Sequence, residues 1–246
     1  HSLTATATDL AGNVSTASGA LNVTVDTAGP TPPTITAYTP DTGLAGDGVT
    51  SAKVITVSGA AEAGSTVKIY DGSALIGSTI ATGSGAWTFK TPALSDGTHS
   101  ISATATDAAG NVSGSSTVLV GNASSTALTI TVDTVAPVAP MNMSFSPDSG
   151  IVGDGITNAS VVVINGLAEA GSTVKLYDGT SFLGSALASA TGAWSFSTAA
   201  LADGSHSLTA TATDLAGNVS VASSGLDVTV DAVAPIVPTI TAVSPD

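Results

Sequence analysis

The stretch H-S-L-T-A-T-A-T-D-L-A-G-N-V-S…V-T-V-D, which spans positions 206–231, is nearly a copy of positions 1–26, and a third version begins at His99. Within it, the apolar residues of positions 208–212 alternate with threonine. Alternation with a period of two predicts half-buried β-strands rather than helices. Because the pattern recurs at roughly domain length, the chain is expected to be a segment of an array of repeats.

The period of the repeat is 107 residues, as the separation of Tyr70 and Tyr177 shows. The repeat ends depart from this period. Asp133 lies 107 residues after Asp26, but Asp231 lies only 98 residues after Asp133, so the first full repeat holds nine additional residues. We place this insertion around V-L-V-G-N-A-S-S, near the last hairpin of that repeat.

Seven short strands are predicted in the second full repeat, separated by D-G, A-G-N and G-D-G turns. Seven antiparallel strands in about a hundred residues favour an immunoglobulin-like β-sandwich. Trp194 and Phe196 share one face of the fifth strand and are expected to fill the core. The predicted strands, lettered A to G in chain order, span 141–145, 160–167, 172–177, 181–187, 193–197, 205–213 and 225–230.

The repeats also predict the domain organisation. Each full repeat can bury one modest core, whereas an isolated two-stranded tail is only marginally stable. We therefore expect the parent polypeptide to continue in both directions. The predicted parts are the C-terminal strands of a preceding repeat (1–26), an immunoglobulin-like repeat with the insertion (27–133), a second such repeat (134–231) and the start of a following repeat (232–246).

The composition is acidic and poor in cations. The chain has 18 acidic residues against four lysines and no arginine, and its formal net charge is −14. This balance argues against nucleic-acid binding, which needs cations to contact phosphates. It favours a solvated surface or bound divalent cations. Cysteine is absent, so there is no disulfide or thiolate metal site, and no apolar run of about 18 residues predicts insertion into a membrane.

The string A-T-D-x-A-G-N-V-S…V-T-V-D-x-x-A-P, with A-E-A-G-S-T-V upstream, resembles the bacterial immunoglobulin-like (Big) repeats of giant surface adhesins. The resemblance covers essentially the whole chain. It implies all-β tandem sandwiches in an extended rod, export by type I secretion, an extracellular location at the bacterial cell surface, and a role in attachment or biofilm cohesion. It also implies calcium at the domain junctions.

Loop topology predicts where such calcium would bind. In a sandwich whose termini lie at opposite ends, the B–C and F–G loops face the preceding domain, and the A–B and E–F loops face the next. Several carboxylates would then meet at each junction without a cation to pair them, and Ca²⁺ accepts oxygens of this kind in loose geometry. The predicted ligands are Asp26, Glu62 and Asp107 at the first junction; Asp133, Glu169 and Asp214, with Asp41 or Asp47, at the second; and Asp231, Asp148 and Asp154 at the third.

An alternative interpretation of these acids stays open. Asp214 precedes L-A-G-N and could form an Asx turn in which Gly217 supplies a positive φ. Asp133 could end a strand as a solvated charge, and D-x-G and G-D-G are ordinary turn sequences. Calcium is favoured because the set recurs at every junction, with the single glutamate of each repeat at one fixed place.

Catalysis is not predicted. His99 and His206 each lie in a D-G-x-H turn without a nearby cysteine or second histidine, so packing at the turn is expected rather than zinc binding. No G-x-S-x-G, H-E-x-x-H or phosphate-binding glycine loop occurs.

The leading functional prediction is a structural stalk or spacer segment of a bacterial cell-surface adhesin, rigidified by interdomain calcium. Its partners would be neighbouring repeats and, through a distal domain, a host, surface or biofilm ligand. Two alternatives stay open. The repeats themselves could bind a glycan or a protein, or they could assemble into an extracellular filament.

Overall fold

The computed structural model describes residues 1–120, 126–239 and 241. The chain divides into two compact units. The first unit contains His1–Pro40 and Lys53–Thr131, and the second contains Asp41–Ala52 and Val132–Asp246. The described residues form strands and no helices, so no membrane-spanning helix is found among them. The fold is therefore all-β, as predicted.

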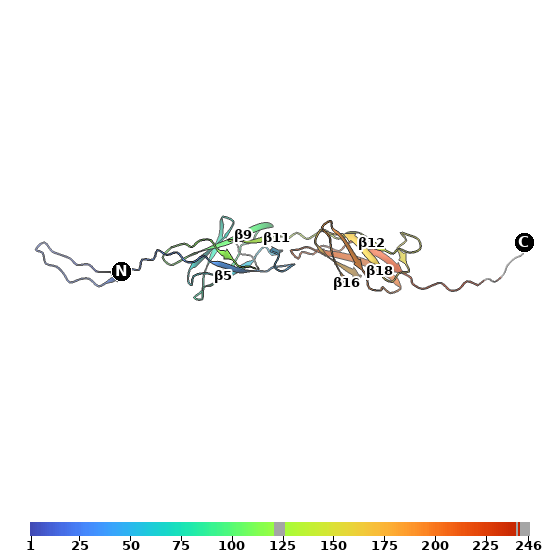
Figure 1. Ribbon diagram of the computed structural model, residues 1–246, viewed down its shortest axis with the longest axis horizontal. Coiled ribbons are helices and arrows are strands. Elements are labelled where there is room, and N and C mark those ends of the chain that lie inside the picture. The colour runs from blue at the N-terminus through green and yellow to red at the C-terminus, as the bar shows by residue number, and fades with distance from the viewer. Residues whose placement is uncertain (121–125, 240, 242–246) are drawn as a thin grey trace. The chain divides into compact units, whose positions relative to one another are not determined.

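The second unit holds a three-stranded sheet in the order β12-β14-β17 and a five-stranded sheet in the order β13-β19-β18-β15-β16 (Figure 1). Seven of its strands overlap the predicted ones. Within described residues 132–239, only β13, which pairs in parallel with β19, is not among the predicted strands. The strands are β12 (Met141–Ser146), β13 (Ile156–Thr157), β14 (Val163–Leu167), β15 (Thr173–Asp178), β16 (Ser181–Leu187), β17 (Ala193–Ser197), β18 (Gly204–Thr213) and β19 (Leu226–Val230).

The core of the second unit lies between these two sheets. Leu208, Ala210 and Ala212 of β18 are buried, as the alternation predicts. Trp194 is only 4% exposed, and its indole lies on the backbone of Gly166 across the β14–β17 pair, where a Cβ would come within 2.8 Å of Cζ2. A side chain on Gly166 would therefore displace the indole.

The first unit repeats this arrangement. Among the strands of this unit, the sheet orders are β10-β3-β5-β8 and β11-β9-β6-β7, and β1 and β2 form a separate antiparallel pair. Trp87 lies opposite Gly59, as Trp194 lies opposite Gly166. The strands of the N-terminal half, including β4 of the segment grouped with the second unit, are β1 (Ser2–Leu3), β2 (Leu21–Asn22), β3 (Thr34–Thr39), β4 (Val49–Thr50), β5 (Thr56–Ala60), β6 (Thr66–Asp71), β7 (Ala74–Ile80), β8 (Ala86–Lys90), β9 (Gly97–Thr106), β10 (Thr117–Val118) and β11 (Leu128–Val132).

The insertion begins directly after Ser116. The Ser116 hydroxyl accepts a hydrogen bond from the Ala103 amide, as the Ser223 hydroxyl does from Ala210, so these serines are equivalent. The next residues form β10, which pairs in parallel with β3 and buries Val118 to 2% exposure. Positions 121–125, the last five residues of the predicted insertion, lie outside the described residues. The described part adds an edge strand to the sheet that does not contain β9 and β11.

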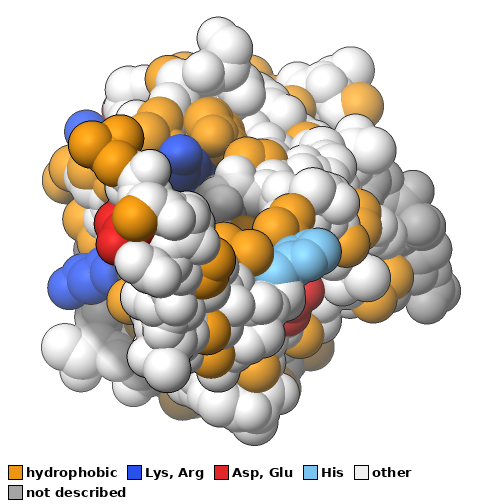
Figure 2. All heavy atoms as spheres, turned by 90° about the vertical axis from the view of Figure 1, so that its left-hand side faces the viewer, with side chains coloured by type: hydrophobic (Ala, Val, Ile, Leu, Met, Phe, Trp, Pro, Cys, Tyr) orange, Lys and Arg blue, Asp and Glu red, His pale blue; other side chains and the backbone are white. Residues whose placement is uncertain are grey.

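The visible surface is mostly uncharged. In the face shown in Figure 2, backbone and uncharged polar side chains predominate, with hydrophobic side chains in small groups and few charged ones. This agrees with a chain in which only 9% of the residues are charged.

Candidate functional site

The D-x-A-G-N motif folds into an Asx turn. Asp214 accepts hydrogen bonds from the backbone N–H of Asn218 on Oδ1 and from its side-chain amide on Oδ2, both at 2.8 Å. Gly217 has a φ of +89° and donates its N–H to the Asp214 carbonyl. The turn described by the alternative interpretation is therefore present. Both oxygens of the Asp214 carboxylate already have donors.

The same turn forms at two other places. In the first repeat, Asn111 binds both oxygens of Asp107. The pKa of Asp107 is lowered, chiefly by the side-chain hydrogen bond from Asn111. In the N-terminal tail, Asn13 binds both oxygens of Asp9, although every residue of that tail is exposed. Because the turn forms without a core around it, it is encoded locally.

In the two full repeats, the asparagine of the turn also holds a linker. The Asn218 side-chain amide donates to the Asp133 carbonyl at 2.9 Å, and the Asn111 amide donates to the Asp26 carbonyl at 3.1 Å. Asp133 additionally donates its own N–H to the Thr50 carbonyl at 2.9 Å. Sequence topology predicts that Asp133 and Asp214 approach one another, and the structure joins both residues to the Asn218 amide.

The segment Asp41–Ala52 packs against this turn inside the second unit. The Thr42 hydroxyl donates to the Ala216 carbonyl at 2.6 Å and accepts from the Ser51 N–H at 2.7 Å. The Leu44 N–H donates to the Leu215 carbonyl at 3.3 Å. The segment is therefore held by backbone groups of the turn.

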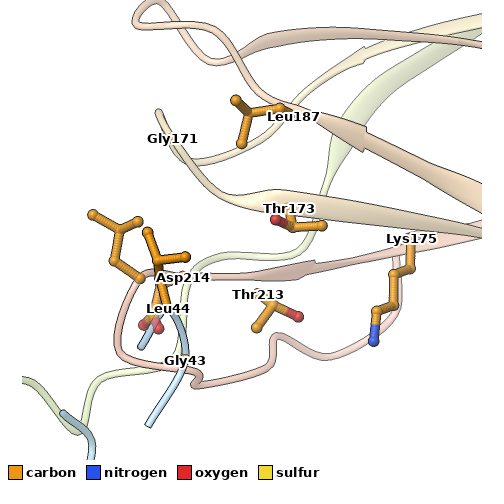
Figure 3. Close-up of a pocket in the computed structure, with 9 residues that line it drawn as sticks. Gly43, Leu44, Gly171, Thr173, Lys175, Leu187, Thr213 and Asp214 are labelled. Carbon is orange, nitrogen blue, oxygen red and sulfur yellow. The ribbon is translucent and has the colours of Figure 1, made fainter. Parts of the chain in front are cut away.

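Glycine makes this close approach possible. A Cβ on Gly43 would lie 2.0 Å from the Leu215 carbonyl oxygen and 2.8 Å from the Gly217 nitrogen. Gly43 also has a φ of +75°. The side chains beside the contact leave an open pocket of about 380 Å³, with Leu44 and Leu187 on either side of it and Lys175 at its far end (Figure 3).

Gly43→Ala is expected to displace Asp41–Ala52 from the turn, because the added methyl group would overlap the Leu215 carbonyl. Amide hydrogen exchange should speed up by about fivefold at Leu44, the effect of losing one net hydrogen bond. Gly46→Ala is the matched control, since Gly46 has a similar φ of +86° but nothing within 4 Å of the place that the new methyl group would take. Equal exchange at Leu44 in both variants would contradict this role for Gly43.

The other predicted aspartates also serve turns. Each accepts a hydrogen bond from a backbone N–H a few residues further along. The pairs are Asp26 with Ala28, Asp41 with Gly46, Asp47 with Val49, Asp133 with Val135, Asp148 with Gly153, Asp154 with Ile156, and Asp231 with Val233.

The two glutamates lie differently from the aspartates. Glu62 and Glu169 lie at the surface, and their backbone carbonyls accept the hydroxyls of Ser65 and Ser172 at 2.7 Å. Among the residues that the structure describes, no group of three or more histidine, aspartate or glutamate side chains is placed to hold a metal ion. Calcium binding by the predicted set stays a prediction.

Each repeat also contains a histidine–aspartate pair that the sequence interpretation missed. His99 Nδ1 lies 2.6 Å from Asp71 Oδ2, and its Nε2 lies 2.9 Å from the Ser95 carbonyl oxygen. His206 contacts Asp178 at 2.7 Å and the Ala202 carbonyl at 2.9 Å in the same way. The sequence does contain a sign of this pairing, because an aspartate precedes the histidine by 28 positions in both repeats.

Both ring nitrogens of these histidines face acceptors. Only the protonated ring can donate at both positions. The pKa of His206 is raised, first by the Ala202 carbonyl and then by Asp178, against an opposing effect of burial. For His99, burial is the largest effect and lowers the pKa, but the Ser95 carbonyl and Asp71 together outweigh it, so that the pKa is raised. The protonated histidine therefore makes the stronger link between the E–F turn, which supplies the Ser95 or Ala202 carbonyl, and the last residue of β6 or β15, which is Asp71 or Asp178.

Solved structures similar to this chain include three modular proteins. The fibronectin(III)-like modules of CbhA from Clostridium thermocellum are 20% identical, with a TM-score of 0.46, and the match covers 79% of this chain and 94% of that one. The BSP domain of a biofilm associated protein is 21% identical, with a TM-score of 0.29, over 84% of this chain and 30% of that one. A tetra-tandem repeat from the extending region of a large adhesion protein is 20% identical, with a TM-score of 0.32, over 94% of this chain and 56% of that one.

The sequence itself gives the family. No curated protein sequence matches the chain. The profile of the bacterial Ig-like domain matches it twice, over residues 30–134 and 135–232. These two matches cover most of the 246 residues. The chain therefore belongs to the bacterial Ig-like domain family.

Proposed function

We propose that this chain is a non-catalytic spacer in the stalk of a bacterial cell-surface adhesin, stiffened by calcium at its domain junctions and serving cell adhesion or biofilm formation. The chain would act outside the cell. Its immediate partners would be neighbouring repeats, and a distal domain would contact the host, surface or biofilm ligand.

The observation that carries this proposal is the hydrogen bonding of the linkers. In both repeats, an asparagine amide holds the carbonyl of the aspartate that begins the linker, at 3.1 Å for Asp26 and 2.9 Å for Asp133. The second linker also contains Pro137 and Pro140, which are both buried. Proline restricts the backbone of the linker and of the residues before it. A linker that is restrained in these two ways suits a spacer better than a free coil would.

The donor set for calcium is only partly available. Carboxylate and carbonyl oxygens are the ligands that Ca²⁺ prefers. At the second junction, the exposed Glu169 carboxylate and the second oxygen of Asp133 have no hydrogen bond within the described residues. Both oxygens of Asp214 are bonded to Asn218. We therefore propose that Asp133 and Glu169 would provide the principal ligands, and that Asp214, whose two oxygens each accept one hydrogen bond from Asn218, would contribute through its remaining lone pairs.

Calcium is expected to stabilise the chain and to restrict its flexibility. Extracellular modules bind Ca²⁺ with a Kd of about 10⁻⁴–10⁻³ M. At a free calcium concentration about ten times the Kd, each site would stabilise the folded state by about 1.4 kcal/mol. Thermal unfolding with and without chelator measures the stability, and small-angle scattering of the same samples measures the maximum dimension and the flexibility.

Charge-removing variants separate a specific site from general ionic effects. Asp133→Asn combined with Glu169→Gln should abolish the calcium-dependent shift in the unfolding midpoint at the second junction. Asp227→Asn is the control, because Asp227 is an exposed residue of β19 that hydrogen-bonds the Ser207 hydroxyl. If chelation changes neither the unfolding midpoint nor the scattering, calcium stiffening is ruled out.

Direct ligand binding by the repeats has less support. An exposed aromatic surface would be the feature to expect for a glycan site. Tyr177 contacts Phe182 with ring centroids 5.6 Å apart, but the rings are inclined at 56° and form no flat platform. The first repeat has Leu75 in place of Phe182. A surface that differs in this way between the repeats does not favour glycan binding as their shared function.

A further inference from the structure

The second repeat contains a counterpart of the segment that packs against the Asx turn. Residues 148–153, D-S-G-I-V-G, correspond to residues 41–46, D-T-G-L-A-G, at the period of 107. We call residues 41–46 the first tongue and residues 148–153 the second tongue. The hydroxyl, glycine and large aliphatic residues that contact the turn in the first tongue are thus Ser149, Gly150 and Ile151 in the second.

The two tongues have the same internal hydrogen bonds. Gly153 N–H donates to Asp148 Oδ2 at 2.6 Å, as Gly46 N–H does to Asp41. The Ser149 hydroxyl accepts from the Asn158 N–H at 2.7 Å, which is the distance between the Thr42 hydroxyl and Ser51 N–H. The second tongue therefore has the shape of the first without needing a turn to fold against.

The glycine at the contact position is also alike. Gly150 has a φ of +77°, against +75° for Gly43. The Leu215 carbonyl oxygen would lie 2.0 Å from a Cβ added to Gly43. Among the residues that the structure describes, no atom lies within 4 Å of a Cβ added to Gly150. The second tongue thus has the conformation of the first, and Gly150 is uncovered where Gly43 of the first tongue contacts the Asx turn.

The two tongues differ in their backbone contacts rather than in side-chain exposure, since Ile151 is 74% exposed and Leu44 is 61% exposed. The amide N–H of Leu44 donates to the Leu215 carbonyl. Within the part of the chain that the structure describes, the corresponding amide of Ile151 has no such acceptor.

From these observations we propose that residues 148–153 form a docking surface for the D-x-A-G-N turn of a further Ig-like repeat. The Ser149 hydroxyl donates to the carbonyl of the alanine of that turn, as Thr42 does to Ala216. Gly150 lies against the turn glycine, and the Ile151 N–H donates to the carbonyl that corresponds to Leu215. The proposal does not depend on calcium or on an adhesin role.

The turn that would dock there is well defined by this chain. Its shape is set by the Asp–Asn hydrogen bonds and by a glycine with positive φ, and it forms even in the exposed Asp9–Asn13 segment. An Ig-like repeat with another loop at this place would not hold two carbonyls in the positions that Leu215 and Ala216 give them. Recognition is therefore by backbone carbonyls that one turn shape presents to the tongue.

The test is to lengthen the full chain after Pro238 with a second copy of residues 141–239. The sequence A-V-A-P-I-V-P at 232–238 matches T-V-A-P-V-A-P at 134–140, so the linker keeps its length. Amide hydrogen exchange at Ile151, read by NMR, should slow by about fivefold or more in the lengthened chain, the effect of one net hydrogen bond. The amide exchange rate of Leu44 in the same sample is the reference, because the Leu44 N–H of the first tongue is already bonded to the Leu215 carbonyl.

Two glycine variants distinguish docking from general ordering. In the lengthened chain, Gly150→Ala should return Ile151 exchange to the rate of the original chain, whereas Gly153→Ala should not. Both glycines have positive φ and open surroundings in the unlengthened chain, so both substitutions strain the backbone alike. Ile151 exchange that is unchanged by lengthening, or slowed equally in both variants, would overturn the proposal. A dispersed amide spectrum for each variant establishes that it is folded.

Discussion

Trp194→Ala is expected to lower the free energy of unfolding of the second repeat by about 3–5 kcal/mol, the usual cost of deleting a large buried aromatic side chain. Trp194 is 4% exposed and belongs to the core cluster that also contains Ile164, Leu176 and Leu208. Because its ring lies on the Gly166 backbone, neighbouring side chains cannot easily fill the space that it leaves. A loss of this size is a large fraction of the stability of a small domain.

The two repeats can be followed separately in this experiment. The chain has two tryptophans, one in each repeat. In Trp194→Ala, the fluorescence of Trp87 reports the first repeat, while circular dichroism reports both. The dichroism transition should move to lower denaturant and the fluorescence transition should stay in place. Phe182→Ala is the control, since Phe182 is 57% exposed. A destabilisation no larger than that of the control would show that the indole does not support the core.

Asp178→Asn is expected to destabilise the second repeat at mildly acidic pH by about 1.5–3 kcal/mol, the range for a hydrogen bond to a charged group. Asp178 accepts from His206 at 2.7 Å and from the Ser207 N–H at 3.3 Å. The second repeat is the simpler case, because Ser160 stands where the first repeat has Lys53, which pairs with Asp96 at 3.7 Å.

The same pair makes stability depend on pH. The pKa of His206 in the folded state is raised above its usual value of 6.5. Folding therefore favours the charged ring. The resulting stabilisation is fully present below the usual pKa and is lost as the pH rises through the raised value. The unfolding free energy of the second repeat should thus fall on going from mildly acidic to mildly alkaline solution.

Denaturant unfolding at several pH values measures this effect. His206→Gln should remove the pH dependence of the second repeat, and His99→Gln should do the same for the first. Asp227→Asn should leave the slope unchanged, because that carboxylate bonds Ser207 rather than a histidine. A wild-type stability that does not change from about pH 6 to about pH 8.5, a range that includes the usual histidine pKa of about 6.5, would exclude the mechanism.

Most of the fold could be predicted because its strands alternate strongly. The predicted spans 181–187 and 193–197 coincide with β16 and β17, and the buried positions of β18 follow the alternation of leucine and alanine with threonine. The two-residue strand β13 was missed, since two residues carry no periodic signal. Its conformation depends on parallel pairing with β19, which only the three-dimensional arrangement provides.

The candidate site was predictable only in part. The Asx-turn alternative for Asp214 and Gly217 is confirmed, because short-range hydrogen bonds decide it. The contact of Thr42 with Ala216 joins residues 174 positions apart. The pairing of His206 with Asp178 follows from the register of β15 against β18, where Asp178 lies opposite Leu208. No local pattern contains that information. Calcium ligation by the predicted carboxylates stays a prediction.

The added strand β10 has a consequence for how this chain reaches its native state. Repeats of nearly equal sequence in one polypeptide can exchange equivalent strands and become trapped in misassembled forms. β10 comes from an insertion that the second repeat lacks, and it buries Val118 against the edge of β3. The second repeat has no matching segment to offer to that edge. β10 can therefore complete the sheet of the first repeat only from within that repeat. This difference between the two repeats disfavours strand exchange between them during synthesis and refolding.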